Sequence, residues 1–171
     1  MTSPSALHLD RQPSPIGELL LVSDEAGILR ALDFHDHEPR LQRLLGRHYG
    51  DRVLEVGVAP RAVRQALADY FDGDFPALNT IPWATAGGAF QKAVWRALTE
   101  IPAGQTQTYG ALAARIGRPS AVRAVGAANG ANPLSILVPC HRLIGANGAL
   151  TGYAGGLDRK AWLLRHEGVA L

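Results

Sequence analysis

Apolar residues near the N-terminus fall into two short runs that have the composition of neighbouring β-strands. The runs cover residues 19–23 and 29–34. The segment between them, Asp24-Glu25-Ala26-Gly27, has the residues of a hairpin turn. The pattern therefore predicts a β-hairpin here, and a further strand is expected over residues 53–58.

Two other segments of this half place apolar residues at helical spacing. They predict helices over residues 37–48 and 60–71, the second with Pro60 in its first turn and Asp72-Gly73 as its stop. Strands and helices together predict a small α/β domain. A connector that contains Pro and Gly, residues 72–88, follows.

The second half is mostly helical in its pattern. Helices are expected over residues 90–100, 109–116 and 121–129, with Thr108 and Ser120 as the N-caps of the last two. Two short helices joined by a turn of about four residues have the pattern of a helix-turn-helix. Such pairs also occur as purely structural elements.

Charge is distributed unevenly between the two halves. Residues 1–85 carry eight Arg, no Lys and twelve acidic residues, whereas residues 86–171 carry nine Lys or Arg and three acidic residues. We therefore place a domain boundary near residue 85, with domains over 1–85 and 86–171. A basic half suggests a polyanionic partner without identifying it.

The chain has one cysteine. An internal disulfide and a zinc site built on several thiolates are thus excluded. No apolar run reaches the length of a membrane span, and the N-terminus lacks the pattern of a secretory signal. We expect a cytoplasmic protein with a reduced thiol.

That cysteine lies in the segment ILVPCHRLIG, where a strand over residues 135–138 is expected before Pro139 and Cys140. A lone cysteine beside an apolar run is usually a buried small hydrophobe. Here His141 and Arg142 make the surroundings electropositive, which stabilises a thiolate, and the thiolate is the nucleophile. Because neighbouring residues of a strand face opposite ways, His141 can assist Cys140 only if the chain turns at Pro139.

A histidine that acts as a base needs a group that fixes its orientation. The basic half offers three carboxylates for this role, Glu100, Asp158 and Glu167. We choose Glu167, in the segment LLRHEG; the alternative is a solvated charge near the C-terminus.

At this point the motifs resemble those of a known family. TYGALAARIG, AVRAVGAANGANP, PCHR, YAGG and RKAWLLRHEG occur in the order and spacing of the O6-alkylguanine–DNA alkyltransferases, also called methylated-DNA–protein-cysteine methyltransferases. The resemblance covers residues 86–171 and is weaker in the first half. It implies a ribonuclease-H-like α/β domain followed by a mostly α, winged-helix-like domain that contains the helix-turn-helix.

The resemblance also implies the reaction. Cys140 takes the alkyl group from O6 of guanine in DNA, His141 acts through a water to deprotonate the thiol, and Glu167 orients His141. Tyr109 donates its hydroxyl proton toward N3 of the base, and Asn132 is the hinge between the helix-turn-helix and the cysteine segment.

The resemblance also implies which residues contact DNA. Arg123 corresponds to the arginine that replaces the extruded nucleotide in the base stack. Ser120 and the small residues Ala124 and Gly126 suit docking in the minor groove, with little sequence preference. The residues that the resemblance assigns to the substrate pocket are Val138, Pro139, Leu143, Tyr153, Ala154 and Lys160.

Some of these assignments have plainer alternatives. Tyr153 could only pack, and Lys160 could be a solvated helix charge. Some family members have Ser at the position of Ala154, which bears on the size of alkyl group tolerated. Repair of O4-alkylthymine stays open.

The product of such a transfer is a thioether, a poor leaving group, and the sequence offers no second nucleophile or cofactor to remove it. Each molecule is therefore expected to react once, without a cofactor or metal. The partner expected is double-stranded DNA containing alkylated guanine, bound by a monomer, alone or cooperatively. The competing hypotheses are a non-reactive damage-binding protein, a DNA-binding regulator and a cysteine hydrolase.

Overall fold

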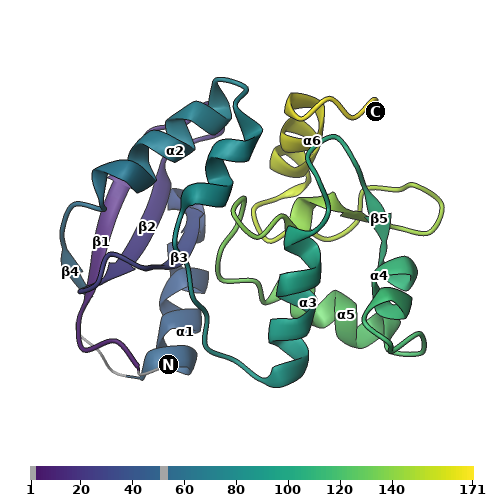
Figure 1. The fold of residues 1–171 in the computed structure, drawn as a ribbon, viewed down its shortest axis with the longest axis horizontal. Coiled ribbons are helices and arrows are strands. Elements are labelled where there is room, and N and C mark those ends of the chain that lie inside the picture. The colour runs from purple at the N-terminus through teal and green to yellow at the C-terminus, as the bar shows by residue number, and fades with distance from the viewer. Residues whose placement is uncertain (1–2, 51–53) are drawn as a thin grey trace. The chain divides into compact units, whose positions relative to one another are not determined.

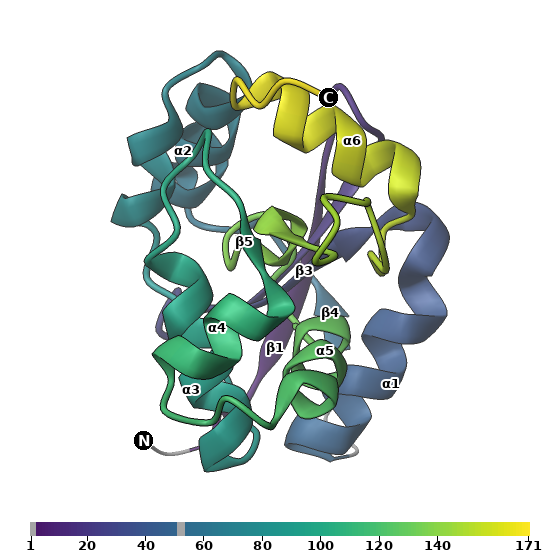
Figure 2. The same cartoon turned by 90° about the vertical axis from the view of Figure 1, so that its right-hand side faces the viewer.

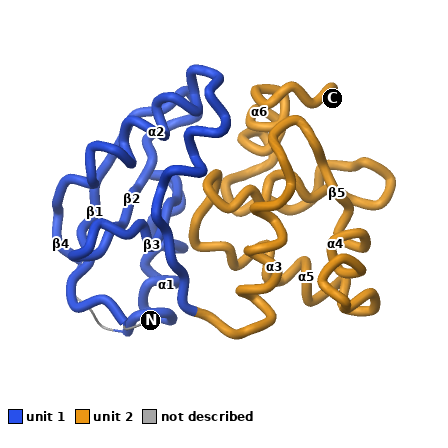
Figure 3. Tube along the Cα trace, in the orientation of Figure 1, with its two compact units in different colours: residues 1–86 blue, residues 87–171 orange. Residues whose placement is uncertain are grey.

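The structure is a computed structural model that describes residues 3–50 and 54–171. The chain divides into two compact units, residues 1–86 and residues 87–171 (Figure 3). Among the described residues, none of the helices has the length and apolar character that crossing a bilayer requires.

The first unit is built on a four-stranded sheet with the order β3-β2-β1-β4 (Figure 1). Its strands are β1 (Leu7–Gln12), β2 (Leu19–Asp24), β3 (Leu29–Phe34) and β4 (Leu54–Val56). The first three strands pair antiparallel, and β4 lies parallel to β1.

Two helices, α1 (Glu38–Tyr49) and α2 (Arg61–Phe71), flank this sheet on opposite sides (Figure 2). The core against α1 contains alternate residues of β1 and β2, because alternate side chains of a strand share one face. Buried residues of this core include Leu7, Leu9, Leu20, Val22, Leu41 and Leu45. Two 3₁₀ helices complete the unit, η1 (His35–His37) and η2 (Phe75–Thr80).

The predicted hairpin and both predicted helices of this unit are confirmed. The strand expected over 53–58 is shorter, Leu54–Val56, and residue 53 lies outside the described residues. Strand β1 was not predicted: its alternation of Leu7 and Leu9 with His8 and Asp10 is the pattern of a strand with one buried face, but it includes only two apolar residues. The connector is more ordered than expected, since it contains η2 and since Trp83 bridges to Leu29.

The second unit consists of short helices around a two-stranded parallel ladder. Its helices are α3 (Ala89–Thr99), α4 (Tyr109–Arg115), α5 (Val122–Gly130), η3 (Cys140–Arg142) and α6 (Leu157–His166), and its strands are β5 (Gln107–Thr108) and β6 (Leu143–Ile144). Trp95 of α3 is buried and donates its indole N–H to the carbonyl of Ala128 on α5 at 2.9 Å. This bond fixes α3 against the second helix of the helix-turn-helix.

Two local predictions for this unit are wrong. Residues 135–138 form a turn instead of a strand, with hydrogen bonds from Leu137 N to Ser135 O and from Val138 N to Leu134 O. Ser120 is not the N-cap of the second helix: α5 begins at Val122 and its N-cap is Ala121, without a side-chain bond. The cause of the first error is tertiary. Contacts with buried groups elsewhere in the unit hold residues 135–138, and these contacts take the place of pairing with a neighbouring strand.

Thr108, in contrast, caps α4 as predicted. Its side-chain oxygen accepts from the backbone N–H of Ala111 at 3.1 Å. This bond satisfies one of the donors left open at a helix start.

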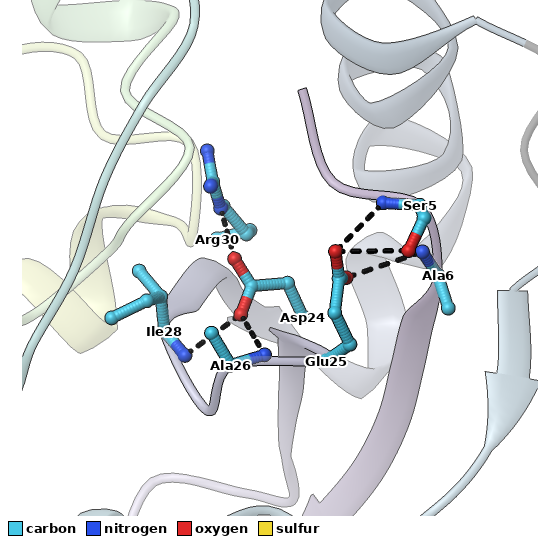
Figure 4. Close-up of polar contacts among 7 residues, drawn as sticks. All are labelled: Ser5, Ala6, Asp24, Glu25, Ala26, Ile28 and Arg30. Carbon is cyan, nitrogen blue, oxygen red and sulfur yellow. Dashed lines mark hydrogen bonds and ion pairs between the residues drawn. The ribbon is translucent and has the colours of Figure 1, made fainter. Parts of the chain in front are cut away.

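The turn between β2 and β3 is held by two carboxylates (Figure 4). One oxygen of Asp24 accepts from the backbone N–H groups of Ala26 and Ile28, and the other accepts from Nε of Arg30 at 2.9 Å. Asp24 and Arg30 are both buried, so the pair is shielded from water.

The neighbouring Glu25 points to the other side of the turn. It accepts from the backbone N–H groups of Ser5 and Ala6 and from the Ser5 hydroxyl (Figure 4). These bonds lower the pKa of Glu25 to about 2.

Removing the Asp24 carboxylate should destabilise the protein strongly. Asp24→Ala leaves the buried Arg30 without its carboxylate and frees two backbone donors of the turn, so a loss of about 3–5 kcal/mol is expected in urea unfolding. Asp24→Asn keeps an acceptor for the turn and should cost less than Asp24→Ala. Equal losses in the two variants would contradict a role in the turn.

Candidate active site

Cys140 is the first residue of η3 and only 3% of its surface is exposed. The preceding turn contains Ile136 in the left-handed region, with φ of 71°, which is costly for a β-branched residue. The backbone N–H of Cys140 then donates to Val138 O at 2.7 Å. The chain thus does turn before the cysteine, as the position of Pro139 suggested.

Two buried asparagines fix this turn from the end of α5. Asn132 donates to Val138 O at 2.8 Å and accepts from the backbone N–H of Leu134 at 2.9 Å. Asn129 donates to Cys140 O at 3.4 Å. The helix-turn-helix and the cysteine segment are therefore tied through side-chain amides, and Asn132 lies at the junction where the resemblance put a hinge.

His141 and Glu167 meet in the interior of the unit. Nε2 of His141 lies 2.9 Å from Oε2 of Glu167, and both side chains are fully buried. Glu167 follows the last residue of α6, so helix packing carries it to the histidine. A solvated position for this carboxylate, the alternative left open above, is therefore wrong.

Arg142 completes the cluster in a way that the sequence analysis missed. Its Nε and Nη2 donate to the two oxygens of Glu167, both at 2.8 Å, and its Nη1 donates to Ile101 O at 2.5 Å. The signal was available, since an arginine next to the motif histidine can bind the same carboxylate in a two-point manner. Arg142 thus neutralises the carboxylate of Glu167.

This arrangement determines the charge of His141. Burial lowers the pKa of His141, and the Glu167 carboxylate opposes that shift but is already paired with Arg142. Bonds from Arg142 and His141 outweigh burial and lower the pKa of Glu167. A neutral imidazole whose Nε2–H is donated to a carboxylate has Nδ1 as its acceptor, and that atom is buried with no hydrogen-bond partner among the described residues.

Lys160 of α6 is entirely buried, so it is not a solvated helix charge. Its Nζ donates to the carbonyls of Leu143 and Thr151, both at 2.6 Å. The Thr151 carbonyl also accepts from the hydroxyl of Tyr109 at 3.2 Å. Lys160 and Tyr109 are thus joined through one backbone oxygen.

Electrostatics connect Lys160 to the cysteine. Burial lowers the pKa of Lys160 to about 8, and negative charge on Cys140 opposes this shift. Lys160 is therefore a cation whose charge is coupled to that of Cys140.

The remaining pocket residues surround the same segment. Val138 and Leu143 are buried, and Ala154 is half-buried. The ring of Tyr153 meets the ring of His141 edge to face, with centroids 6.5 Å apart. Their roles toward a substrate stay predictions.

The helix-turn-helix is formed by α4 and α5 (Figure 2). On α5, Arg123 and Ala124 are exposed and Gly126 is half-buried, while Ser120 is exposed in the turn before the helix. This surface combines one cation with small side chains, so a large ligand can approach the backbone closely.

No group of His, Cys, Asp or Glu able to hold a metal ion occurs in the described parts of the chain. The site is that of a buried cysteine next to a histidine–carboxylate pair, within a unit that carries a helix-turn-helix. This combination is typical of a protein that performs chemistry on a nucleic acid with its own thiol.

Comparison with known proteins supports this class. Residues 89–169 match the family model of the 6-O-methylguanine DNA methyltransferase, DNA binding domain. Two curated relatives are named methylated-DNA–protein-cysteine methyltransferase. The one from Salmonella typhimurium is 53% identical and covers 92% of this chain and 94% of its own, and the one from Methanosarcina acetivorans is 46% identical and covers 91% and 94%.

Solved structures are similar to this chain over a comparable share of its length. The O6-methylguanine methyltransferase of Mycobacterium tuberculosis is 40% identical, with a TM-score of 0.77, over 94% of this chain and 92% of its own. A structure of Mycobacterium tuberculosis OGT in complex with DNA is 38% identical, with a TM-score of 0.79 and the same coverage. The chain belongs to the family of methylated-DNA–protein-cysteine methyltransferases, in agreement with the resemblance found in the sequence.

Stability should depend on pH through His141. Burial lowers the folded-state pKa of His141 below the usual 6.5. Below that pH the unfolded chain binds a proton at His141 that the folded chain does not bind, so the free energy of unfolding decreases as pH falls. Urea unfolding should show this loss between about pH 7 and pH 5.5, and His141→Gln should reduce the slope by at most about 1.4 kcal/mol per pH unit. A slope unchanged by the substitution would contradict a buried neutral histidine.

Proposed function

We propose that this protein repairs DNA by transferring a methyl or other alkyl group from O6 of guanine to Cys140, irreversibly and once per molecule. The observation that carries the proposal is a buried cysteine followed by a buried histidine that is held by Glu167, in a chain of this family. The relatives named above are methylated-DNA–protein-cysteine methyltransferases.

The transfer is a displacement at the alkyl carbon. The thiol proton of Cys140 passes through a water to Nδ1 of His141, and the thiolate sulfur forms a bond to the alkyl carbon as the carbon–O6 bond breaks. The bonding electrons stay on the guanine, and the hydroxyl of Tyr109 donates a proton at N3 so that the base leaves neutral. Phenolate and imidazolium are then restored to their neutral forms by proton exchange with solvent.

Lys160 and Glu167 have supporting roles in this proposal. Lys160 fixes the carbonyls of Leu143 and Thr151, and with the latter the position of the Tyr109 hydroxyl. Glu167 keeps the proton of His141 on Nε2, which leaves Nδ1 to accept. Val138, Pro139, Tyr153 and Ala154 form the wall of the base pocket.

DNA binding uses the exposed surface of α5. O6 of guanine is out of reach within a duplex, so the alkylated base must leave the stack, at a cost of a few kcal/mol. Arg123 fills the space that the base vacates, and the small side chains Ala124 and Gly126 let the helix enter the minor groove. Asn132 is the hinge behind the helix, and Ser120 meets the backbone beside it.

The two parts of the chain take different tasks. Residues 86–171 bind DNA and accept the alkyl group, as a winged-helix-like domain that contains the helix pair α4 and α5. Residues 1–85 form a ribonuclease-H-like domain, supported by an antiparallel sheet with one parallel edge strand. The protein acts as a monomer in the cytoplasm, where a reducing environment suits its thiol.

Mass spectrometry tests the proposal directly. Mixing the protein with a duplex that contains O6-methylguanine should add one methyl group to Cys140 in the intact mass, and each molecule should react once. Cys140→Ser, which keeps the size and polarity of the side chain, should gain none.

The outcomes separate the alternatives. DNA binding without any gain in mass would indicate a damage-binding protein or a regulator, and repeated turnover on an acyl substrate would indicate a hydrolase. Any of these results overturns the proposal.

Alkylation should also destabilise the fold. Cys140 is tightly enclosed, and extra carbon atoms in a packed interior cost about 1–3 kcal/mol. The methylated protein should therefore unfold at a lower urea concentration than the unreacted protein. Coincident unfolding curves for the two forms would contradict this expectation.

A further inference from the structure

A groove of about 440 Å³ lies in the second unit, away from Cys140. One wall is a face of α3 that carries Lys92 and Arg96, one helical turn apart. The other wall is the end of α4, with Arg115 and Ile116. Because α3 packs against α4, the groove runs directly beside the first helix of the helix-turn-helix.

The α3 wall of the groove is positively charged, because it carries Lys92 and Arg96. Lys92 and Arg96 are exposed, and neither forms an ion pair within the described part of the chain. The acidic side chain of the groove, Glu100, follows the last residue of α3 and lies one helical turn after Arg96. It is exposed and 4.0 Å from Arg115, and among the described residues it forms no ion pair with Lys92 or Arg96.

Arg115 holds the groove in shape. Its guanidinium donates to the carbonyl of Ala97 and so links the last turn of α4 to the last turn of α3. The positions of Lys92 and Arg96 relative to the helix-turn-helix are therefore fixed by a direct hydrogen bond between the two walls. Lys92 and Arg96, on a rigid helix beside the helix-turn-helix, thus form a preorganised surface for binding an anion.

We propose that this groove binds the phosphodiester backbone of the same duplex that α5 enters, with one phosphate on Lys92 and one on Arg96. In helix-turn-helix proteins the first helix crosses the DNA backbone while the second enters a groove. The groove borders that first helix at its last turn, just before the turn that leads to α5. Arg118, which is also exposed, lies between α4 and α5 in the sequence and adds a cation between the two helices that would contact the duplex.

The contact supplies affinity and not sequence preference. Phosphates carry no base identity, so they position the protein while the flipped base provides the specificity. This division suits a protein that must examine any sequence for damage. The inference rests on the proposed function, because it presupposes that α5 binds duplex DNA.

Salt titration of DNA binding tests the groove. Each phosphate contact contributes about 0.9 to the slope of the logarithm of affinity against the logarithm of salt concentration, so K92Q/R96Q should lower the slope by about 2 and weaken binding at least about tenfold at low salt. The loss should be equal for several unrelated duplexes. Arg165→Gln, which removes an exposed charge from α6, is the matched control and should leave the slope unchanged.

A second measurement does not depend on a variant. The chain has two lysines, and Lys160 is buried, so acetylation by a water-soluble reagent should mark Lys92. Undamaged duplex DNA should protect Lys92 several-fold. Thermal melting of K92Q/R96Q within the range of the unsubstituted protein establishes that it is folded.

The results distinguish the two proposals. An unsubstituted protein that gains no methyl group refutes the proposed function. A protein that gains the methyl group but shows the same salt slope after K92Q/R96Q, or no protection of Lys92 by DNA, refutes the groove alone.

Discussion

The buried carboxylate of Glu167 organises the second unit. It joins the end of α6 to the segment after Cys140, because Arg142 binds both of its oxygens and His141 donates to one of them. A buried ion pair of this kind is a poor source of stability compared with apolar packing. Its value here is chemical: the arginine absorbs the negative charge, so the histidine can remain neutral and keep a free lone pair.

The cluster also explains why the cysteine segment is irregular. In a strand, the side chains of Cys140 and His141 would point to opposite sides. Instead, the chain turns at residues 134–138 and continues into the 3₁₀ helix that contains both residues. Ile136 has an unfavourable backbone conformation in this turn, and the amide of Asn132 holds the turn in place. Backbone strain next to a reactive residue is thus maintained by a side chain from the helix-turn-helix.

The local sequence pattern was sufficient to predict those elements whose structure is determined by the residues within them. The hairpin of β2 and β3, the capped start of α4 and the amphipathic helices were all predictable in this way. Pattern failed for β1, whose alternation includes only two apolar residues, and for residues 135–138, whose apolar run resembles a strand. The partner of Arg142 and the buried state of Lys160 depend on contacts between distant segments, so spacing in the sequence did not reveal them. The set of Cys140, His141 and Glu167, in contrast, was predictable from the electropositive neighbours of the cysteine and the few carboxylates of the basic half, and the family resemblance implies the same three residues.

The solitary cysteine has one more consequence. Since the chain carries a single thiol and the reaction consumes it, the amount of free thiol in a sample equals the number of repairs that the sample can still perform. The fraction of molecules that carry an alkyl group on the cysteine therefore gives the number of repairs already performed. A cell that depends on such a protein has a repair capacity limited by synthesis of new chains, and its protection against alkylation is a stock that is depleted rather than a rate that is sustained.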